Sequence, residues 1–190
     1  MKCKHLTWLL LLGLMACRNE VESPKPYAFH RIALHERTYV QLETDCPFSF
    51  ELPDLVNIKR PPNAEHPCWM NLEYPELKAT IHLSYKEISS KAQLGKYIDD
   101  SQRMTFKHTI KASSIEEIPI QHEGRRLYGF YYRVGGNAAS NSQFYITDSS
   151  RHFVRGAMYF MSEARSDSLA PVIDYVLEDI GRIIESFQWH

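Results

Sequence analysis

The C-terminal end of the chain carries the apolar pattern that most constrains the fold. Its apolar side chains recur at the spacing of one helix face: Leu169, Val172, Ile173, Val176, Ile180, Ile183, Ile184 and Phe187. This spacing predicts an amphipathic helix of about 20 residues. Ser168 is the expected cap, and Pro171 falls in the first turn, where no amide hydrogen bond is lost. A helix with one apolar face must cover another element, so the rest of the chain has to supply that surface.

Strand patterns in the preceding sequence predict such a surface. Short apolar or alternating runs, separated by turn residues, are expected to form strands at 39–42, 48–52, 68–74, 78–85, 115–122, 126–134, 143–147 and 152–160. Links of hairpin length, such as Pro75-Glu76 and Glu123-Gly124, favour antiparallel pairing of these strands.

One further helix is expected between the strands, from residue 90 to residue 108. Leu94, Tyr97 and Ile98 fall on one helical face there, and Ser90 followed by Gln93 is a capping-box pattern. The element order predicts a single α+β domain over residues 27–190, a mainly antiparallel β-sheet packed by two α-helices. This order is similar to that of the Mog1/PsbP-like αβα sandwich.

The N-terminus has the three parts of an export signal. Lys2 and Lys4 supply positive charge, residues 6–16 are apolar, and Leu14-Met15-Ala16-Cys17 resembles a lipoprotein cleavage site. The apolar run is shorter than the roughly 20 residues that span a bilayer. We therefore expect residues 1–16 to be a lipoprotein signal peptide, although an ordinary secretory signal and an uncleaved anchor are the alternatives.

Cys17 is then the mature N-terminus and the lipidation site. Two or more acyl chains, palmitate for example, anchor a protein stably, whereas a single chain binds reversibly. Residues 17–26 are polar and contain proline, so they are expected to be a tether. We expect a cell-envelope lipoprotein that faces the periplasm, with the outer membrane favoured over the inner.

Charge excludes one class of partner. The whole chain has 22 Lys and Arg against 23 Asp and Glu; loss of Lys2 and Lys4 with the signal leaves 20 against 23, a net charge of −3. A chain with no basic surplus is not expected to bind nucleic acid.

Two of the four cysteines remain once Cys3 leaves with the signal and Cys17 is acylated. In an oxidising compartment Cys46 and Cys68 are expected to form a disulfide. The alternative is a metal site that combines them with His66 or His82, but no CxxC or HxxxH spacing supports it. No metal and no cofactor are therefore expected.

The most unusual segment is the small-residue loop at 135–142. It begins with Gly135, Gly136, Asn137, Ala138, Ala139 and Ser140. A phosphate loop is excluded, because no Lys-Ser or Lys-Thr pair follows and the next element is a strand. The alternatives are a conformationally demanding turn and a surface that binds a partner protein.

No catalytic signature is found. Asp148, Ser149, Ser150 and His152 are triad residue types, but they lie within five positions of each other on an expected turn, whereas a triad usually converges from separate elements. A turn stabilised by Asp and Ser side chains is favoured over a hydrolase site. We expect a protein that is not an enzyme.

Histidines and aromatic residues are interpreted as structural. His82 is expected to contact Glu73 across a hairpin. Aromatic residues on both faces of the strand at 128–132 imply that some face outward. Outward aromatics would suit a partner surface, or an envelope lipoprotein that binds a small molecule or a glycan.

Several stretches together resemble one family, the gliding-motility lipoprotein D (GldD) family of Bacteroidota. The resemblance extends from the lipobox to the C-terminal helix and is carried by Pro24-Lys25-Pro26, Cys46-Pro47-Phe48, Pro67-Cys68-Trp69-Met70-Asn71, Lys78 to Tyr85, Gly136 to Ser140, Gln143-Phe144-Tyr145 and Gly156 to Phe160. It implies an accessory or assembly component of the gliding machinery and the associated type IX secretion system. The implied partners are other envelope proteins of that apparatus, and no catalytic residue is carried over.

Overall fold

The computed structural model describes residues 34–107, 112–136, 138–161 and 166–190. All of them fall in one compact unit, Ile32–His190. The signal peptide, Cys17, the tether and Asn137 lie outside the described residues. No helix in the described part of the chain is both long enough and apolar enough to cross a membrane.

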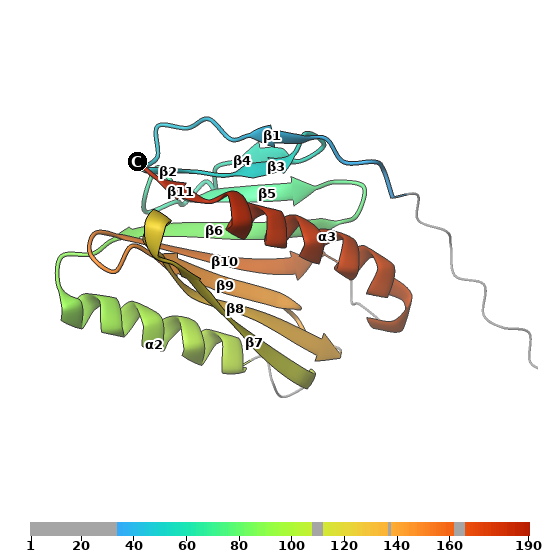
Figure 1. Ribbon diagram of the computed structural model, residues 1–190. Coiled ribbons are helices and arrows are strands. Elements are labelled where there is room, and N and C mark those ends of the chain that lie inside the picture. The colour runs from blue at the N-terminus through green and yellow to red at the C-terminus, as the bar shows by residue number, and fades with distance from the viewer. Residues whose placement is uncertain (1–33, 108–111, 137, 162–165) are drawn as a thin grey trace, which may run out of the picture. The chain divides into compact units, whose positions relative to one another are not determined.

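The described elements are mostly strands (Figure 1). In chain order they are β1 (Tyr39–Gln41), β2 (Phe48–Ser49), β3 (Glu51–Pro53), β4 (Asn57–Lys59), β5 (Met70–Tyr74), β6 (Ala79–Glu87), α2 (Lys91–Lys107), β7 (Ala112–His122), η2 (Glu123–Arg125), β8 (Leu127–Gly136), β9 (Ser142–Thr147), β10 (His152–Phe160), α3 (Ser166–Ser186) and β11 (Gln188–Trp189).

The main sheet has seven strands in the order β4-β5-β6-β10-β9-β8-β7. Every neighbouring pair in it is antiparallel. The remaining strands form two short two-stranded sheets. Strand β1 pairs with β3, and β11 pairs with β2 through Trp189 and Phe48. Strands β4 and β11 were not expected from the sequence.

The two helices cover opposite faces of this sheet. Side chains alternate across each strand, so Tyr131 and Phe144 belong to the apolar cluster beneath α3, which contains Val176, Ile180 and Ile183. Tyr132 and Tyr145 belong instead to the cluster against which α2 packs. The structure thus confirms the predicted α+β fold with a mainly antiparallel sheet packed by two helices.

Because helices cover both faces of the main sheet, the aromatic residues of β8 are interpreted differently. Tyr131 and Tyr132 point to opposite faces, yet both are buried. Phe130 is half-buried and packs against Tyr132 and Tyr145. The expectation of outward aromatic residues on this strand was therefore wrong for these rings, because α2 covers the face that the sequence left open.

The helix starts also differ from expectation. Helix α3 begins at Ser166, so Pro171 lies beyond the first turn and one intrahelical hydrogen bond is missing. The side chain of Ser168, the expected cap, is outside the described set. At α2 the Ser90 hydroxyl accepts the Gln93 amide as predicted, but the Gln93 side chain accepts from the Ser89 amide instead of that of Ser90.

Candidate functional site

The loop at 135–142 is held in shape by its own side chains. The amide of Asn141 donates to the carbonyls of Val134 at 3.1 Å and Gly136 at 3.3 Å, and the Ser140 hydroxyl donates to the carbonyl of Ser142 at 3.1 Å. The carbonyl of Asn141 accepts the Val134 amide at 2.8 Å. These contacts satisfy the backbone groups that the end of β8 would leave unpaired, so the loop is preorganised.

Local geometry favours glycine at positions 135 and 136. Gly136 has a φ of 86°, which L side chains rarely adopt, and a Cβ on Gly135 would lie 2.4 Å from the hydroxyl of Ser114. The β7–β8 register shifts between Ala112 and Ser114, so a bulge brings this serine against Gly135.

The expected loop residues separate into two groups. Gly135 and Gly136 line a surface groove, and Ala139 is exposed. Ala138 and Ser140 are buried, so neither is available to a partner. Of the described residues in the predicted binding loop, Gly135, Gly136 and Ala139 therefore remain as candidates for contact with a partner.

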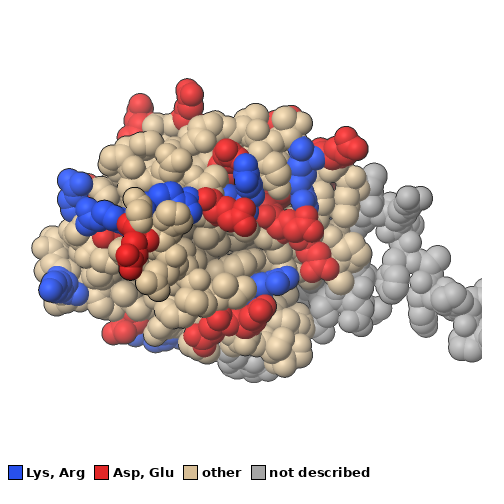
Figure 2. Space-filling view, in the orientation of Figure 1, with Lys and Arg blue, Asp and Glu red and all other residues tan. Residues whose placement is uncertain are grey.

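The groove beside the loop has a volume of about 470 Å³ and runs between the end of the β7–β8 pair and α3. Ile173 and Leu177 of α3 give it an apolar wall, whereas Glu116 and Arg133 line the strand side, 3.7 Å apart. Figure 2 shows this face hollowed beside α3, with Asp and Glu side chains along the helix.

The groove opens onto the edge of the main sheet. Strand β7 is the outermost strand there, and among the described strands it pairs with β8 alone. Its side chains are exposed or half-buried over all 11 residues. Ser113, Ser114 and Glu116 of this edge strand also line the groove, so the two features form one continuous surface.

The expected turn at 148–152 is a turn and does not have triad geometry. The carboxylate of Asp148 accepts the backbone amides of Ser150, Arg151 and His152, and the hydroxyl of Ser150. Burial acts to raise the pKa of Asp148, but these hydrogen bonds outweigh it and hold the pKa well below its usual value. Ser150 thus donates to the carboxylate and has no imidazole base.

His152 points to a different partner. Its Nδ1 lies 2.7 Å from the hydroxyl of Tyr85, and its ring stacks on Trp189 with centroids 5.4 Å apart. Burial lowers the pKa of His152, which favours the neutral ring. Asp148, Ser150 and His152 are neighbours in this turn, but they do not form the chain of proton transfers that a hydrolase needs.

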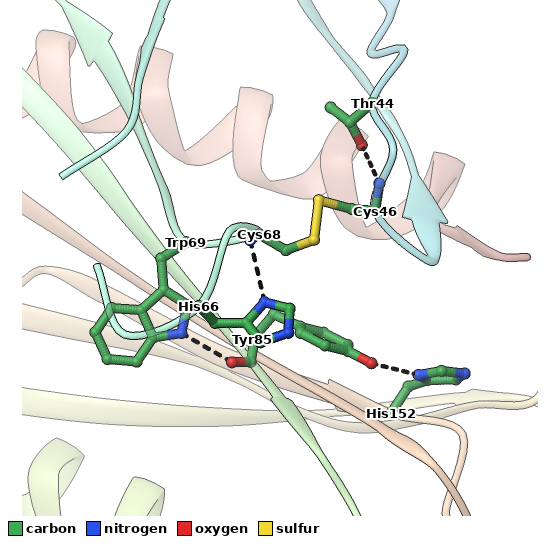
Figure 3. The surroundings of a disulfide bond; sticks show 7 residues. All are labelled: Thr44, Cys46, His66, Cys68, Trp69, Tyr85 and His152. Atoms are coloured by element: carbon green, nitrogen blue, oxygen red, sulfur yellow. Dashed lines mark hydrogen bonds between the residues drawn. A yellow bond between two sulfur atoms is a disulfide. The ribbon is translucent and has the colours of Figure 1, made fainter.

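The disulfide lies near a row of three rings, His66, Tyr85 and His152 (Figure 3). Cys46 and Cys68 are bonded to each other, so neither thiolate is free to bind a metal. His66 accepts the amide of Cys68 at 3.1 Å, and Trp69 donates to the carbonyl of Tyr85 at 2.8 Å. No group of three potential metal ligands occurs among the residues that the structure describes.

His82 has a different neighbour from the expected one. Its Nδ1 lies 2.7 Å from the side-chain oxygen of Asn71, which is directly opposite in the β5–β6 register. Glu73 pairs with Lys59 instead, at 2.6 Å. The expected pairing was therefore wrong by two residues, because Glu73 stands opposite Thr80.

A buried charge cluster was missed by the sequence reasoning. Asp179 has no exposed surface, and its carboxylate lies 3.0 Å from Nε of Arg37 and 2.8 Å from the hydroxyl of Tyr39. Arg37 also contacts Glu178 and stacks on the ring of Tyr175 at 3.8 Å. The sequence does contain a signal for this cluster: the charged residue Asp179 lies three residues after Val176, on the apolar face of α3.

An antiparallel sheet with one helix on each face defines an αβα sandwich of the α+β class. Within this class the sequence decides the family. Residues 19–189 match the family described as gliding motility lipoprotein GldD, and the chain belongs to it. This is a family of lipoproteins involved in gliding motility, not a known enzyme family, and its members are anchored at a membrane of the cell envelope.

No curated protein matched the chain. Among solved structures, the chain is similar to the solution structure of cyanobacterial PsbP (CyanoP) from Synechocystis sp. PCC 6803, with a TM-score of 0.47 and 15% identity. That similarity covers 83% of this chain and 95% of the other.

Proposed function

We propose that this protein is an accessory or assembly component of the gliding machinery and its associated type IX secretion system. Its described domain acts by binding another envelope protein, and the lipid on Cys17 keeps it at the membrane surface. Family membership supports the link to gliding. The lipobox-like sequence before Cys17 supports the anchor, and we place the domain on the periplasmic side, with the outer membrane favoured.

The anchor has a direct test. Cells carrying Cys17→Ala are expected to release the protein from the membrane fraction, whereas the wild type stays with it. Protease added to intact cells should leave the wild-type domain uncleaved if it faces the periplasm. Retention of the variant in the membrane would contradict lipid anchoring, and cleavage in intact cells would contradict the orientation.

The observation that carries the binding proposal is the outer edge of β7 beside the groove, which no other described strand covers. A strand with unpaired amides and carbonyls accepts an added strand from another chain. Pro119 has no amide hydrogen and stands opposite Phe130 in continuous pairing, so its nitrogen faces away from β8. Since alternate residues share a direction, the amides of Ile115 and Glu117 also face outward.

The proposed occupant is an extended, basic segment of a neighbouring envelope protein. It would pair along the Ala112–Ile118 part of β7, because Pro119 offers no donor beyond it. Glu116 and Glu117 are exposed on this stretch and favour Lys or Arg on the incoming strand. A second copy of β7 is disfavoured, since antiparallel self-pairing around these residues would place glutamates opposite each other.

The test is Glu117→Pro compared with Glu117→Ala in living cells. Proline removes an outward amide without removing a hydrogen bond to β8, so the fold should persist while strand addition fails. We expect Glu117→Pro to abolish spreading of colonies and co-purification of its partner, and Glu117→Ala to keep both.

A charge variant provides an independent arm in case the proline affects folding. Glu117→Lys keeps the amide but repels a basic strand, so it should weaken co-purification, with a normal unfolding transition as the control. Wild-type motility and partner recovery in both Glu117→Pro and Glu117→Lys would overturn the proposal.

A further inference from the structure

A second groove, of about 500 Å³, lies between the C-terminal strand β11 and the η2 turn that follows β7. Its lining is predominantly basic and includes Arg125, Arg126, Arg151, His152, Trp189 and His190. We call it the basic groove. Lys and Arg side chains gather at the left end of the face in Figure 2, on the side where β11 lies in Figure 1.

The positive charge of the basic groove is poorly compensated. Asp148 also lines it, but this carboxylate accepts three backbone amides and a hydroxyl, and it lies 3.9 Å from Nη2 of Arg126. The same Nη2 donates to neutral groups, the Ser150 hydroxyl at 2.8 Å and the Asp148 carbonyl at 3.3 Å. Arg125 donates to main-chain carbonyls, including that of Phe187, which carry no net charge. Arg151 is exposed, and within the described chain its side chain makes no hydrogen bond or ion pair.

Hydrogen bonds, ring stacking and the disulfide hold the residues around the basic groove in place. The amide of His190 donates to the carbonyl of Pro47 at 3.0 Å, and its ring Nε2 lies 2.9 Å from the hydroxyl of Ser49. Trp189 stacks on His152 and donates to the carbonyl of Arg126 at 3.2 Å. The Cys46–Cys68 disulfide is attached directly before Pro47, so it restrains the segment that holds the last residues.

We propose that the basic groove binds an oxyanion of the phosphate class, with Arg126 and Arg151 as its principal ligands. Guanidinium groups present paired N–H donors that match phosphate oxygens. A phosphate would accept hydrogen bonds from the exposed guanidinium of Arg151. The attraction is local to this groove, because the mature chain as a whole carries a net negative charge and would otherwise repel an anion.

Two sources can supply such a phosphate group, a free phosphate ester or a lipid headgroup, and binding by the full-length protein in neutral detergent distinguishes them. Inorganic phosphate tests the first source. Mixed micelles of the same detergent with phosphatidylglycerol, compared with micelles that contain phosphatidylcholine, test the second. Binding of phosphate alone assigns a small ligand, and preferential binding of the phosphatidylglycerol micelles with no phosphate response assigns a headgroup. No binding in either arm overturns the proposal.

A matched pair of substitutions distinguishes a specific binding site from a general effect of positive charge. Arg151→Gln is expected to weaken binding by about tenfold, since one charged hydrogen-bonding group is lost. Arg60→Gln removes the same charge from an exposed position outside the groove and should leave binding unchanged. Equal weakening by both variants, or no weakening by Arg151→Gln, would contradict the proposal.

The His152 ring gives a readout inside the groove. Charged groups around it are Asp148, Glu87, Arg126 and Arg151, and the hydroxyl of Tyr85 contacts its Nδ1. A bound anion stabilises the imidazolium, so saturating phosphate should raise the pKa of His152 measured by NMR. An unchanged His152 pKa at saturation would place the anion elsewhere and overturn the assignment.

Discussion

The guanidinium of Arg37 lies 3.0 Å from the carboxylate of Asp179, and Asp179 is completely buried. The two residues are far apart in the sequence, one before the first strand and the other in the last helix. Their contact, with Tyr39 on the same carboxylate oxygen, fastens the start of the described domain to α3. Burial raises the pKa of Asp179, and the hydrogen bond from Tyr39 and the charge of Arg37 oppose that rise.

Asp179→Ala should lower the free energy of unfolding by roughly 3 kcal/mol, because it leaves Nε of Arg37 and the hydroxyl of Tyr39 without their buried carboxylate partner. Asp174→Ala is the matched control, since Asp174 is exposed on the same helix and is expected to change stability by less than about 0.5 kcal/mol. Urea unfolding monitored by circular dichroism measures both. Equal stability of the two variants would show that the cluster does not stabilise the fold.

Loss of the Cys46–Cys68 disulfide should destabilise the domain. The cysteines are separated by 22 residues, and closing such a loop stabilises by about 3 kcal/mol in the chain-entropy model. Unfolding of Cys46→Ala/Cys68→Ala should match that of reduced wild type. Reductant should have no effect on the variant, and an identical midpoint in oxidised and reduced wild type would contradict the prediction.

Asp148→Asn should make stability less dependent on acid pH. The folded pKa of Asp148 lies below its unfolded value of about 3.9, so the carboxylate contributes stability above that pH and loses it as pH falls through the folded pKa. The variant should be less stable than wild type at pH 7 by roughly 1–3 kcal/mol. This difference should shrink below about pH 4; a difference that is constant with pH would contradict the assignment.

Two glycine substitutions are expected to have opposite signs. A Cβ on Gly129 would lie 1.9 Å from the carbonyl oxygen of Tyr145, so Gly129→Ala should separate β8 from β9 and cost roughly 3 kcal/mol. Gly95 lies inside α2 with nothing within 4 Å of its added Cβ, so Gly95→Ala should stabilise by about 0.5–1 kcal/mol. Thermal unfolding of both variants measures the two effects.

The sequence was sufficient for the fold class because its signals are local. Alternation at residues 70–74 and 79–85 and helical spacing in α3 each report which face is buried. Strand order is not local. The pairing of Phe48 with Trp189 joins the two ends of the domain, and no pattern near either residue indicates it.

The candidate site was only partly predictable for the same reason. The small residues at 135–140 indicated a conformationally demanding turn, and Gly136 has a positive φ of 86° there. Whether β7 is an edge strand depends on the order of all seven strands, so the sequence could not locate the free edge. The basic groove likewise combines Arg126, Arg151 and Trp189 from three elements, and its charge is invisible in the overall composition.

The central claim is that β7 receives a strand from another envelope protein, and site-specific photo-cross-linking in intact cells tests it most directly. A photoreactive phenylalanine analogue replaces Glu117 on β7 or, as the control, Ile58 on β4 at the opposite edge of the same sheet. We predict that position 117 yields one adduct with a gliding-apparatus protein, mapped by mass spectrometry to an extended basic segment, and that position 58 does not. No such adduct at position 117, or the same adducts at both edges, would contradict it.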